Sequence, residues 1–105
     1  MAETSTEEKI RLFRSKYGET IELARKKFEE AEERYEGKFT ILDYFKLHGM
    51  KDLAYEVWKD VLRIINLIEN EEELTSVQKA ELEDKVPDLI NYTAMIPALM
   101  QFYKK

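Results

Sequence analysis

The sequence contains no cysteine, one histidine, three glycines and two prolines, and each shortage excludes a class of chemistry or structure. Without cysteine the chain has no disulfide, thiolate zinc site, iron–sulfur cluster or thiol nucleophile. The single histidine, His48, excludes most histidine-based metal sites and weakens the case for a Ser–His catalytic triad. Five glycines and prolines in 105 residues leave few positions for turns, which favours long helices.

Positive charge and long apolar runs are also scarce. The 17 Lys and Arg residues are outnumbered by 22 Asp and Glu residues, which gives a formal net charge of −5. An acidic chain repels a phosphate backbone, so we expect no nucleic-acid binding. No apolar run approaches about 18 residues, so we expect no membrane partner. The acidic start from Met1 to Glu8 is unlike a signal peptide, and we therefore expect a cytoplasmic, intracellular location.

The composition predicts one folded domain over residues 1–105, with residues 1–5 as a flexible N-terminus. Ser5 and Glu8 have the spacing of a capping box at the start of a helix. Apolar residues then follow at steps of three or four, which is the pattern of one helix face: Ile10, Phe13, Tyr17, Ile21, Ala24, Phe28, Ala31 and Tyr35. The pattern stays in phase across Gly18, which favours one helix of about 30 residues over two helices.

Three further helices are predicted after Gly37. Thr40 and Gly49 bound a short one over about residues 40–47. The segment from residue 51 to about residue 68 has a wide apolar arc, so we expect it to be the buried centre, with Trp58 in the core. Thr75 or Ser76 caps a last segment that reaches about residue 103, with bends at Pro87 and Pro97. The predicted fold is all-α, an antiparallel bundle of four to five helices.

Four polar residues in the last segment form one stripe on a continuous helix, because they are separated by three, four and three positions: Glu81, Asp84, Asp88 and Asn91. Three stacked carboxylates repel one another unless a cation or a basic side chain lies among them. Their hard oxygen atoms suit Mg²⁺ or Mn²⁺. A solvent-facing stripe, or one paired with basic residues, remains the alternative interpretation.

A second polar stripe, formed by Glu56, Asp60 and Arg63, interrupts the apolar segment 51–68. If the two stripes face each other, one metal site would take its ligands from both segments, namely Glu56, Asp60, Glu81, Asp84 and Asp88. Glu30 and Glu33 also have E-x-x-E spacing for a divalent metal, although we favour a solvated helix face as their explanation.

Residues 37–95 resemble the small phage-type MazG-like proteins of the all-alpha nucleoside triphosphate pyrophosphohydrolase group, in the branch described as nucleotide-modification associated. The resemblance lies in Phe39 and the run Ile41 to Gly49, in Arg63-Ile64-Ile65-Asn66, and in the run Glu81 to Tyr92. The last run is similar to the family's E-x-x-D followed by an aspartate, an asparagine and a tyrosine.

The resemblance implies a helical fold that binds a nucleotide through Mg²⁺ or Mn²⁺, with a water attacking between the alpha and beta phosphates to release pyrophosphate. Glu81 and Asp84 would be catalytic metal ligands, and Asp88 a third ligand or a support. Arg63 would face the phosphates and Asn91 would orient the substrate. It also implies a homodimer, or at least a homo-oligomer, and a virus-encoded origin.

Two other functions fit the residues without catalysis. The acidic surface, the long first helix and the aromatic end from Tyr92 to Tyr103 are also typical of a helical interaction module, such as a viral accessory protein or a small subunit of an assembly. An acidic mimic of nucleic acid is disfavoured, because basic residues interleave the acidic ones almost throughout.

Overall fold

The computed structural model describes residues 5–34, 43, 47–69 and 71–102, and their regular structure is helical. Three long helices, α1 (Thr6–Arg34), α3 (Met50–Leu67) and α4 (Ser76–Met100), are accompanied by one 3₁₀ turn, η1 (Glu71–Glu73). The predicted all-helical class is therefore confirmed. The described ranges show fewer elements than the four to five helices we expected, because the first helix is not divided and most of the expected helix over residues 40–47 lies outside them.

Local capping explains where the helices begin. The Oγ atom of Ser5 accepts a hydrogen bond from the backbone N–H of Glu8 at 3.1 Å, as the spacing predicted. Thr75 and Gln78 form a complete capping box at the start of α4. Gly49 precedes α3 with a φ of 83°, a left-handed conformation that glycine adopts without steric cost.

The first helix is continuous across Gly18, which confirms the prediction from its apolar pattern. Helix α4 is likewise continuous through Pro87 and Pro97. Most of the predicted short helix over residues 40–47 lies outside the described residues. Within that range the structure describes Asp43 and Leu47, and both are helical.

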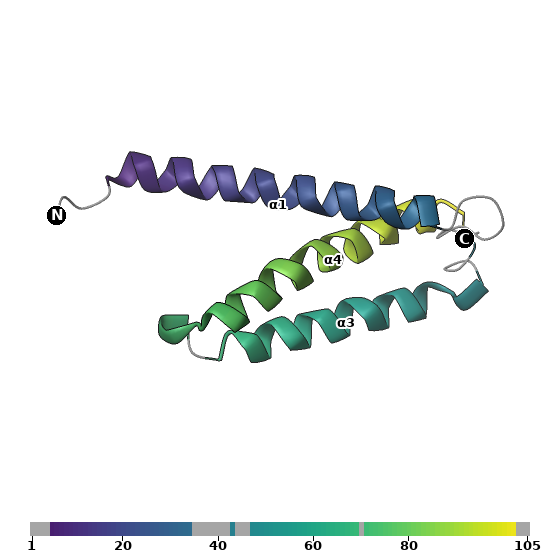
Figure 1. The fold of residues 1–105 in the computed structure, drawn as a ribbon. Helices are drawn as coiled ribbons and strands as arrows, with labels where there is room; N and C mark the ends of the chain where they lie inside the picture. Colours follow the sequence, from purple (N-terminus) through teal and green to yellow (C-terminus); the bar gives the residue numbers. More distant parts are fainter. Residues whose placement is uncertain (1–4, 35–42, 44–46, 70, 103–105) are drawn as a thin grey trace.

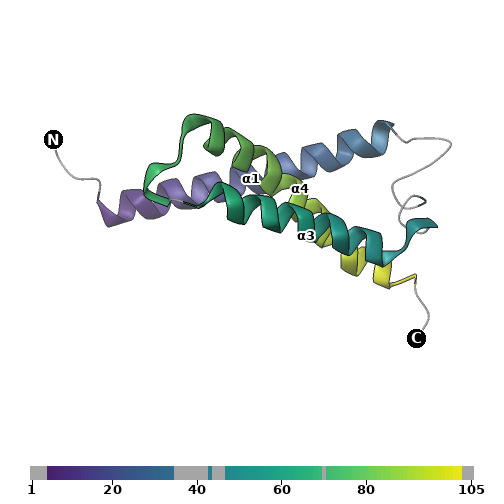
Figure 2. The ribbon, with the colours of Figure 1, turned by 90° about the horizontal axis from the view of Figure 1, so that it is seen from below.

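The central helix is α4, and our expectation that segment 51–68 would be the buried centre is wrong. One side of α4 packs against α3, which runs antiparallel to it, and another side crosses α1 (Figures 1 and 2). Leu53 of α3 and Leu99 of α4 are the buried core pair. Around them pack four partly buried side chains, Met50, Tyr92, Met95 and Ile96.

The three helices form an open, elongated molecule. The radius of gyration is 17.2 Å, whereas a compact chain of this length has about 13 Å. The accessible surface is 8803 Å², and a typical folded monomer of 12.5 kDa exposes about 6,200 Å². The N-terminal part of α1 projects beyond its crossing with α4 (Figure 1), which explains part of this excess.

Candidate functional site

The carboxylates of the polar stripe of α4 bind basic side chains on both neighbouring helices. Glu81 binds Arg63 of α3, whereas Asp84 and Asp88 bind Lys27 of α1. The alternative interpretation of this stripe, pairing with basic residues, therefore describes its contacts. The stripe joins α1 and α3 through charged contacts that flank the small apolar core.

Arg63 and Glu81 make a bidentate contact between α3 and α4. The Nη2 atom of Arg63 lies 2.6 Å from Oε1 and 2.7 Å from Oε2 of Glu81, and its Nε atom lies 3.0 Å from Oε1. A planar guanidinium matches the two oxygens of a carboxylate, so this pair fixes geometry as well as charge. The phosphate-facing role expected for Arg63 stays a prediction, and in this arrangement its guanidinium is bound by Glu81.

Lys27 was not among the residues that we expected at the site. Its Nζ atom lies 2.8 Å from Oδ1 of Asp84, 3.2 Å from the Asp84 carbonyl oxygen and 3.6 Å from Oδ1 of Asp88. Burial opposes the charge on Lys27, but the Asp84 hydrogen bond and the Asp88 charge outweigh it and raise the Lys27 pKa. The hydrogen bond from Lys27 lowers the pKa of Asp84. A signal was present in the sequence, because Lys27 borders the apolar pattern at Ala24 and Phe28.

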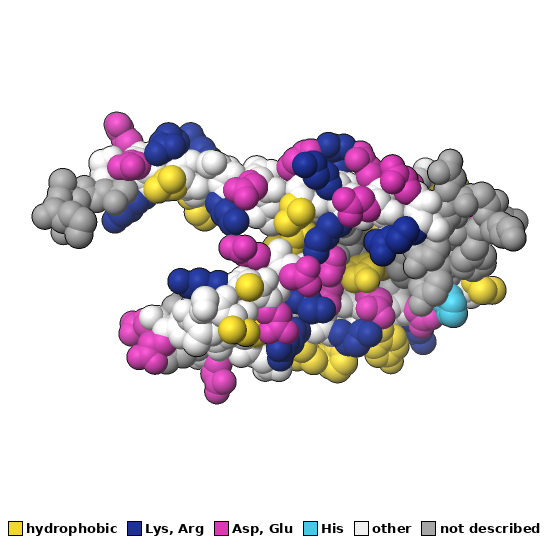
Figure 3. Space-filling model, in the orientation of Figure 1, with side chains coloured by type: hydrophobic (Ala, Val, Ile, Leu, Met, Phe, Trp, Pro, Cys, Tyr) yellow, Lys and Arg dark blue, Asp and Glu magenta, His cyan; other side chains and the backbone are white. Residues whose placement is uncertain are grey.

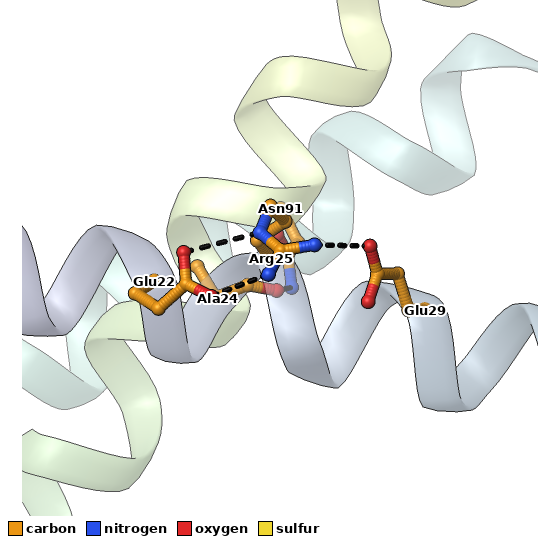
Figure 4. A network of polar contacts seen from close by, with 5 residues as sticks. All are labelled: Glu22, Ala24, Arg25, Glu29 and Asn91. Atoms are coloured by element: carbon orange, nitrogen blue, oxygen red, sulfur yellow. Dashed lines mark hydrogen bonds and ion pairs between the residues drawn. The ribbon is translucent and has the colours of Figure 1, made fainter.

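Asn91 completes the α1–α4 contact from α4. Its Nδ2 atom donates a hydrogen bond of 2.9 Å to the carbonyl oxygen of Ala24, which is itself buried (Figure 4). The neighbouring residue Arg25 binds two carboxylates of its own helix, Glu22 and Glu29 (Figure 4). The substrate-orienting role that the resemblance implied for Asn91 stays a prediction, and its contact with Ala24 joins α1 to α4.

Asp60 is the one charged residue of the described chain that is buried. The residue is 8% exposed, and its Oδ2 atom has no hydrogen-bond partner. Burial raises the pKa of Asp60, and the charges of Asp88 and Glu56 act in the same direction against those of Lys85 and Lys59. Glu56, one turn earlier, is half-buried and its Oε1 atom lies 3.0 Å from Nζ of Lys59.

The five expected metal ligands do not gather into a metal centre in this arrangement. No group of three or more His, Cys, Asp or Glu side chains within the described ranges is placed to hold a metal ion. The reason is that Glu81 is paired with Arg63, while Asp84 and Asp88 are paired with Lys27. Glu30 and Glu33 lie exposed on α1. As arranged, the residues do not fit a bound Mg²⁺ or Mn²⁺.

A second feature, which we define as the outer stripe of α3, consists of four exposed apolar side chains: Tyr55, Trp58, Leu62 and Ile65. They follow one another at steps of three and four, on the side of α3 opposite the buried Leu53, Asp60 and Leu67. Trp58 is 57% exposed, so its predicted place in the core is wrong. The wide apolar arc reflects two opposite apolar faces, of which α4 covers one.

The outer stripe includes an open groove. Lys51, Ala54, Tyr55 and Trp58 line about 360 Å³ of space at the N-terminal end of α3. In the space-filling view, hydrophobic side chains are exposed along the lower edge of the molecule, which follows α3 (Figure 3).

A third apolar surface lies on the N-terminal arm of α1, which we define as residues 6–21. Four members of the predicted apolar face are exposed there: Ile10, Phe13, Tyr17 and Ile21. Only Ala24, close to the crossing with α4, is buried among the members that the structure describes. The pattern predicted the helix correctly, but it did not predict which part of the face would be covered.

Within the described ranges, no helix combines the length and apolar character needed to cross a membrane. Comparisons of the chain with protein-family models, with curated proteins and with solved structures found no match.

Proposed function

We propose that the protein is a non-catalytic helical interaction module that presents the outer stripe of α3 to a helix of another protein chain. The observation that carries this proposal is the exposure of Tyr55, Trp58, Leu62 and Ile65 on the side of α3 that α4 leaves uncovered. Contiguous apolar patches on a soluble protein mark interaction surfaces more often than isolated apolar residues do.

The spacing of the outer stripe suits a helical partner. Side chains at steps of three and four lie on one line along a helix, which is the pattern that helix–helix contacts use. Trp and Tyr supply large contact areas, and such aromatic residues are enriched among the energetically dominant residues of interfaces. The groove beside Trp58 offers space for a partner side chain.

The rest of the molecule supports this role. The paired charges of the α4 stripe hold α1 and α3 in place, so they act as a scaffold that keeps the outer stripe exposed.

The test compares wild-type protein with Trp58→Ser and Ile65→Ser, both as affinity baits and in mass measurements of the purified protein. We expect wild type to hold a helical chain, identical or different, that both variants lose. Lys59→Ala is the matched control, because Lys59 is exposed on α3 outside the outer stripe. A monomer that holds no chain, or equal retention by all variants, would contradict the proposal.

A second candidate is Mg²⁺-dependent nucleotide binding or pyrophosphohydrolysis in the manner of the MazG-like proteins. The observation that favours it is Asp60, whose buried Oδ2 atom lacks a partner while the charges of Glu56 and Asp88 act on it. These carboxylates would first have to leave the arrangement described above, in which they hold no metal, and a cation bound between them would then supply charge neutralisation for a triphosphate. Lys27 would then have to release Asp88.

This candidate is tested by adding Mg²⁺ or Mn²⁺ with a panel of canonical and modified triphosphates and measuring pyrophosphate release and thermal shift. We expect a metal-dependent shift that Asp60→Asn abolishes and that Glu30→Gln, on the exposed face of α1, leaves unchanged. The absence of both turnover and shift with every triphosphate would remove the candidate.

A further inference from the structure

The outer stripe of α3 has a symmetric order along the helix. The apolar residues Tyr55, Trp58, Leu62 and Ile65 are flanked by Lys51 in the first turn of α3, four positions before Tyr55, and by Glu69, which follows Ile65 by four positions and lies two residues beyond the end of the helix. Successive members from position 51 to position 69 are separated by four, three, four, three and four positions. The spacing is therefore the same when it is counted from either end. Lys51 and Glu69 are both exposed.

A stripe with this order is complementary to itself when two copies run antiparallel. Position 55 then faces position 65 of the other copy, and position 58 faces position 62. Each layer combines a larger aromatic with a smaller aliphatic side chain, Tyr with Ile and Trp with Leu. A two-fold axis requires an isologous contact of this kind, in which the same patch serves both partners. Alternating steps of three and four are also the spacing with which paired helices interlock their side chains.

The charges at the two ends select the antiparallel direction. Lys51 at the start of the stripe would face Glu69 of the other copy, and the same contact would occur twice. In a parallel pair, Lys51 would face Lys51 and Glu69 would face Glu69, and such like-charge contacts disfavour a partner orientation.

We infer that the partner of the outer stripe is a second copy of this chain, bound antiparallel through α3, with Lys51 of each copy against Glu69 of the other. This inference rests on the proposed function and names its partner. The four apolar residues form the centre of the interface, and the two charge pairs close its ends.

A charge-reversal experiment tests the inference, with the dimer dissociation constant measured by sedimentation equilibrium. We expect Lys51→Glu and Glu69→Lys each to weaken dimerisation by about tenfold, because each variant creates two like-charge contacts. The double variant, which carries both changes, restores the wild-type constant. Trp58→Ala weakens dimerisation by about a hundredfold. Phe13→Ala, at a more exposed aromatic on the arm of α1, leaves the constant unchanged.

Cysteine cross-linking provides an independent readout, because the natural chain has no cysteine. A mixture of Lys51→Cys and Glu69→Cys proteins should form the mixed disulfide in preference to either homodimeric disulfide. Preferred Lys51→Cys homodimers would instead indicate a parallel pair and overturn the inference. Circular dichroism of each variant confirms that the helices are retained.

The remaining outcomes separate this inference from the proposed function. A monomer that binds a different protein through Trp58 would overturn the second-copy inference and leave the interaction module standing. A dimer that Phe13→Ala disrupts, while Lys51→Glu does not, would also overturn the inference. A monomer that binds no chain at all would remove both.

Discussion

The Nζ atom of Lys27 on α1 lies 2.8 Å from Oδ1 of Asp84 on α4, and these two residues are 57 positions apart in the sequence. The same ammonium group lies 3.6 Å from Asp88. Three carboxylates spaced along one face of α4 would repel one another, and Lys27 together with Arg63 supplies the positive charge that stabilises them. The residue types of the α4 stripe made it a candidate metal site. In the structure, basic side chains neutralise its charge instead.

Replacing Lys27 by Met should destabilise the fold by about 0.5–1 kcal/mol at pH 7, because Asp84 and Asp88 lose their cation in a partly exposed contact. Because the pKa of Asp84 is lowered in the folded state, the Lys27–Asp84 pair contributes fully to the stability of the fold above pH 3.8. This contribution is lost as the pH falls through the lowered pKa. The difference between variant and wild type should therefore disappear in acid. Urea unfolding at several pH values measures it, with Lys26→Met as the control. A difference that persists at pH 2 would show that packing, rather than charge, explains the effect.

Replacing Asn91 by Ala should cost about 1–2 kcal/mol, because the carbonyl of the buried Ala24 loses its donor at the α1–α4 crossing. Thermal unfolding followed by circular dichroism provides the measurement. The matched control is Gln101→Ala, whose amide binds the Ala98 carbonyl at the exposed end of α4. Equal effects of the two substitutions would contradict a specific role for Asn91.

Replacing Asp60 by Asn should stabilise the protein at pH 7 by about 1–3 kcal/mol, since the charge is removed from a buried carboxylate whose Oδ2 atom has no partner. Burial raises the folded-state pKa of Asp60 above 3.8, so the folded state binds the proton more tightly than the unfolded state. The contribution of Asp60 to the stability of the wild-type fold is therefore greatest below pH 3.8. It falls as the pH rises through the raised pKa of Asp60. The advantage of the variant should vanish at low pH, as measured by urea unfolding. Glu56→Gln, which removes a carboxylate paired with Lys59, should give no such gain.

Replacing Gly18 by Ala should stabilise α1 by about 1 kcal/mol, because glycine disfavours a helix interior. A Cβ atom added at Gly18 would meet nothing within 4 Å, so no steric cost offsets the gain. Helix content and midpoint temperature from circular dichroism test this prediction. A lower midpoint would indicate that another chain packs closely against α1 at this position.

Local signals predicted the helices well because their causes lie within a few residues. The capping residues Ser5 and Thr75, and the apolar spacing that runs across Gly18, act through hydrogen bonds and side-chain contacts one turn away. The same local logic identified the polar stripe of α4. It could not identify Lys27 as the partner, because that contact depends on how α1 crosses α4.

The sequence alone determined that the chain is helical, acidic and free of cysteine chemistry, and where its long helices begin, since these properties follow from composition and from contacts within a turn. Only the tertiary structure decided which apolar faces are covered. It made α4 the central helix, left Trp58 exposed and left Asp60 buried without a partner for its Oδ2 atom. The physical reason is that an apolar pattern specifies a face that favours burial, whereas the relative placement of whole helices determines whether another surface reaches it.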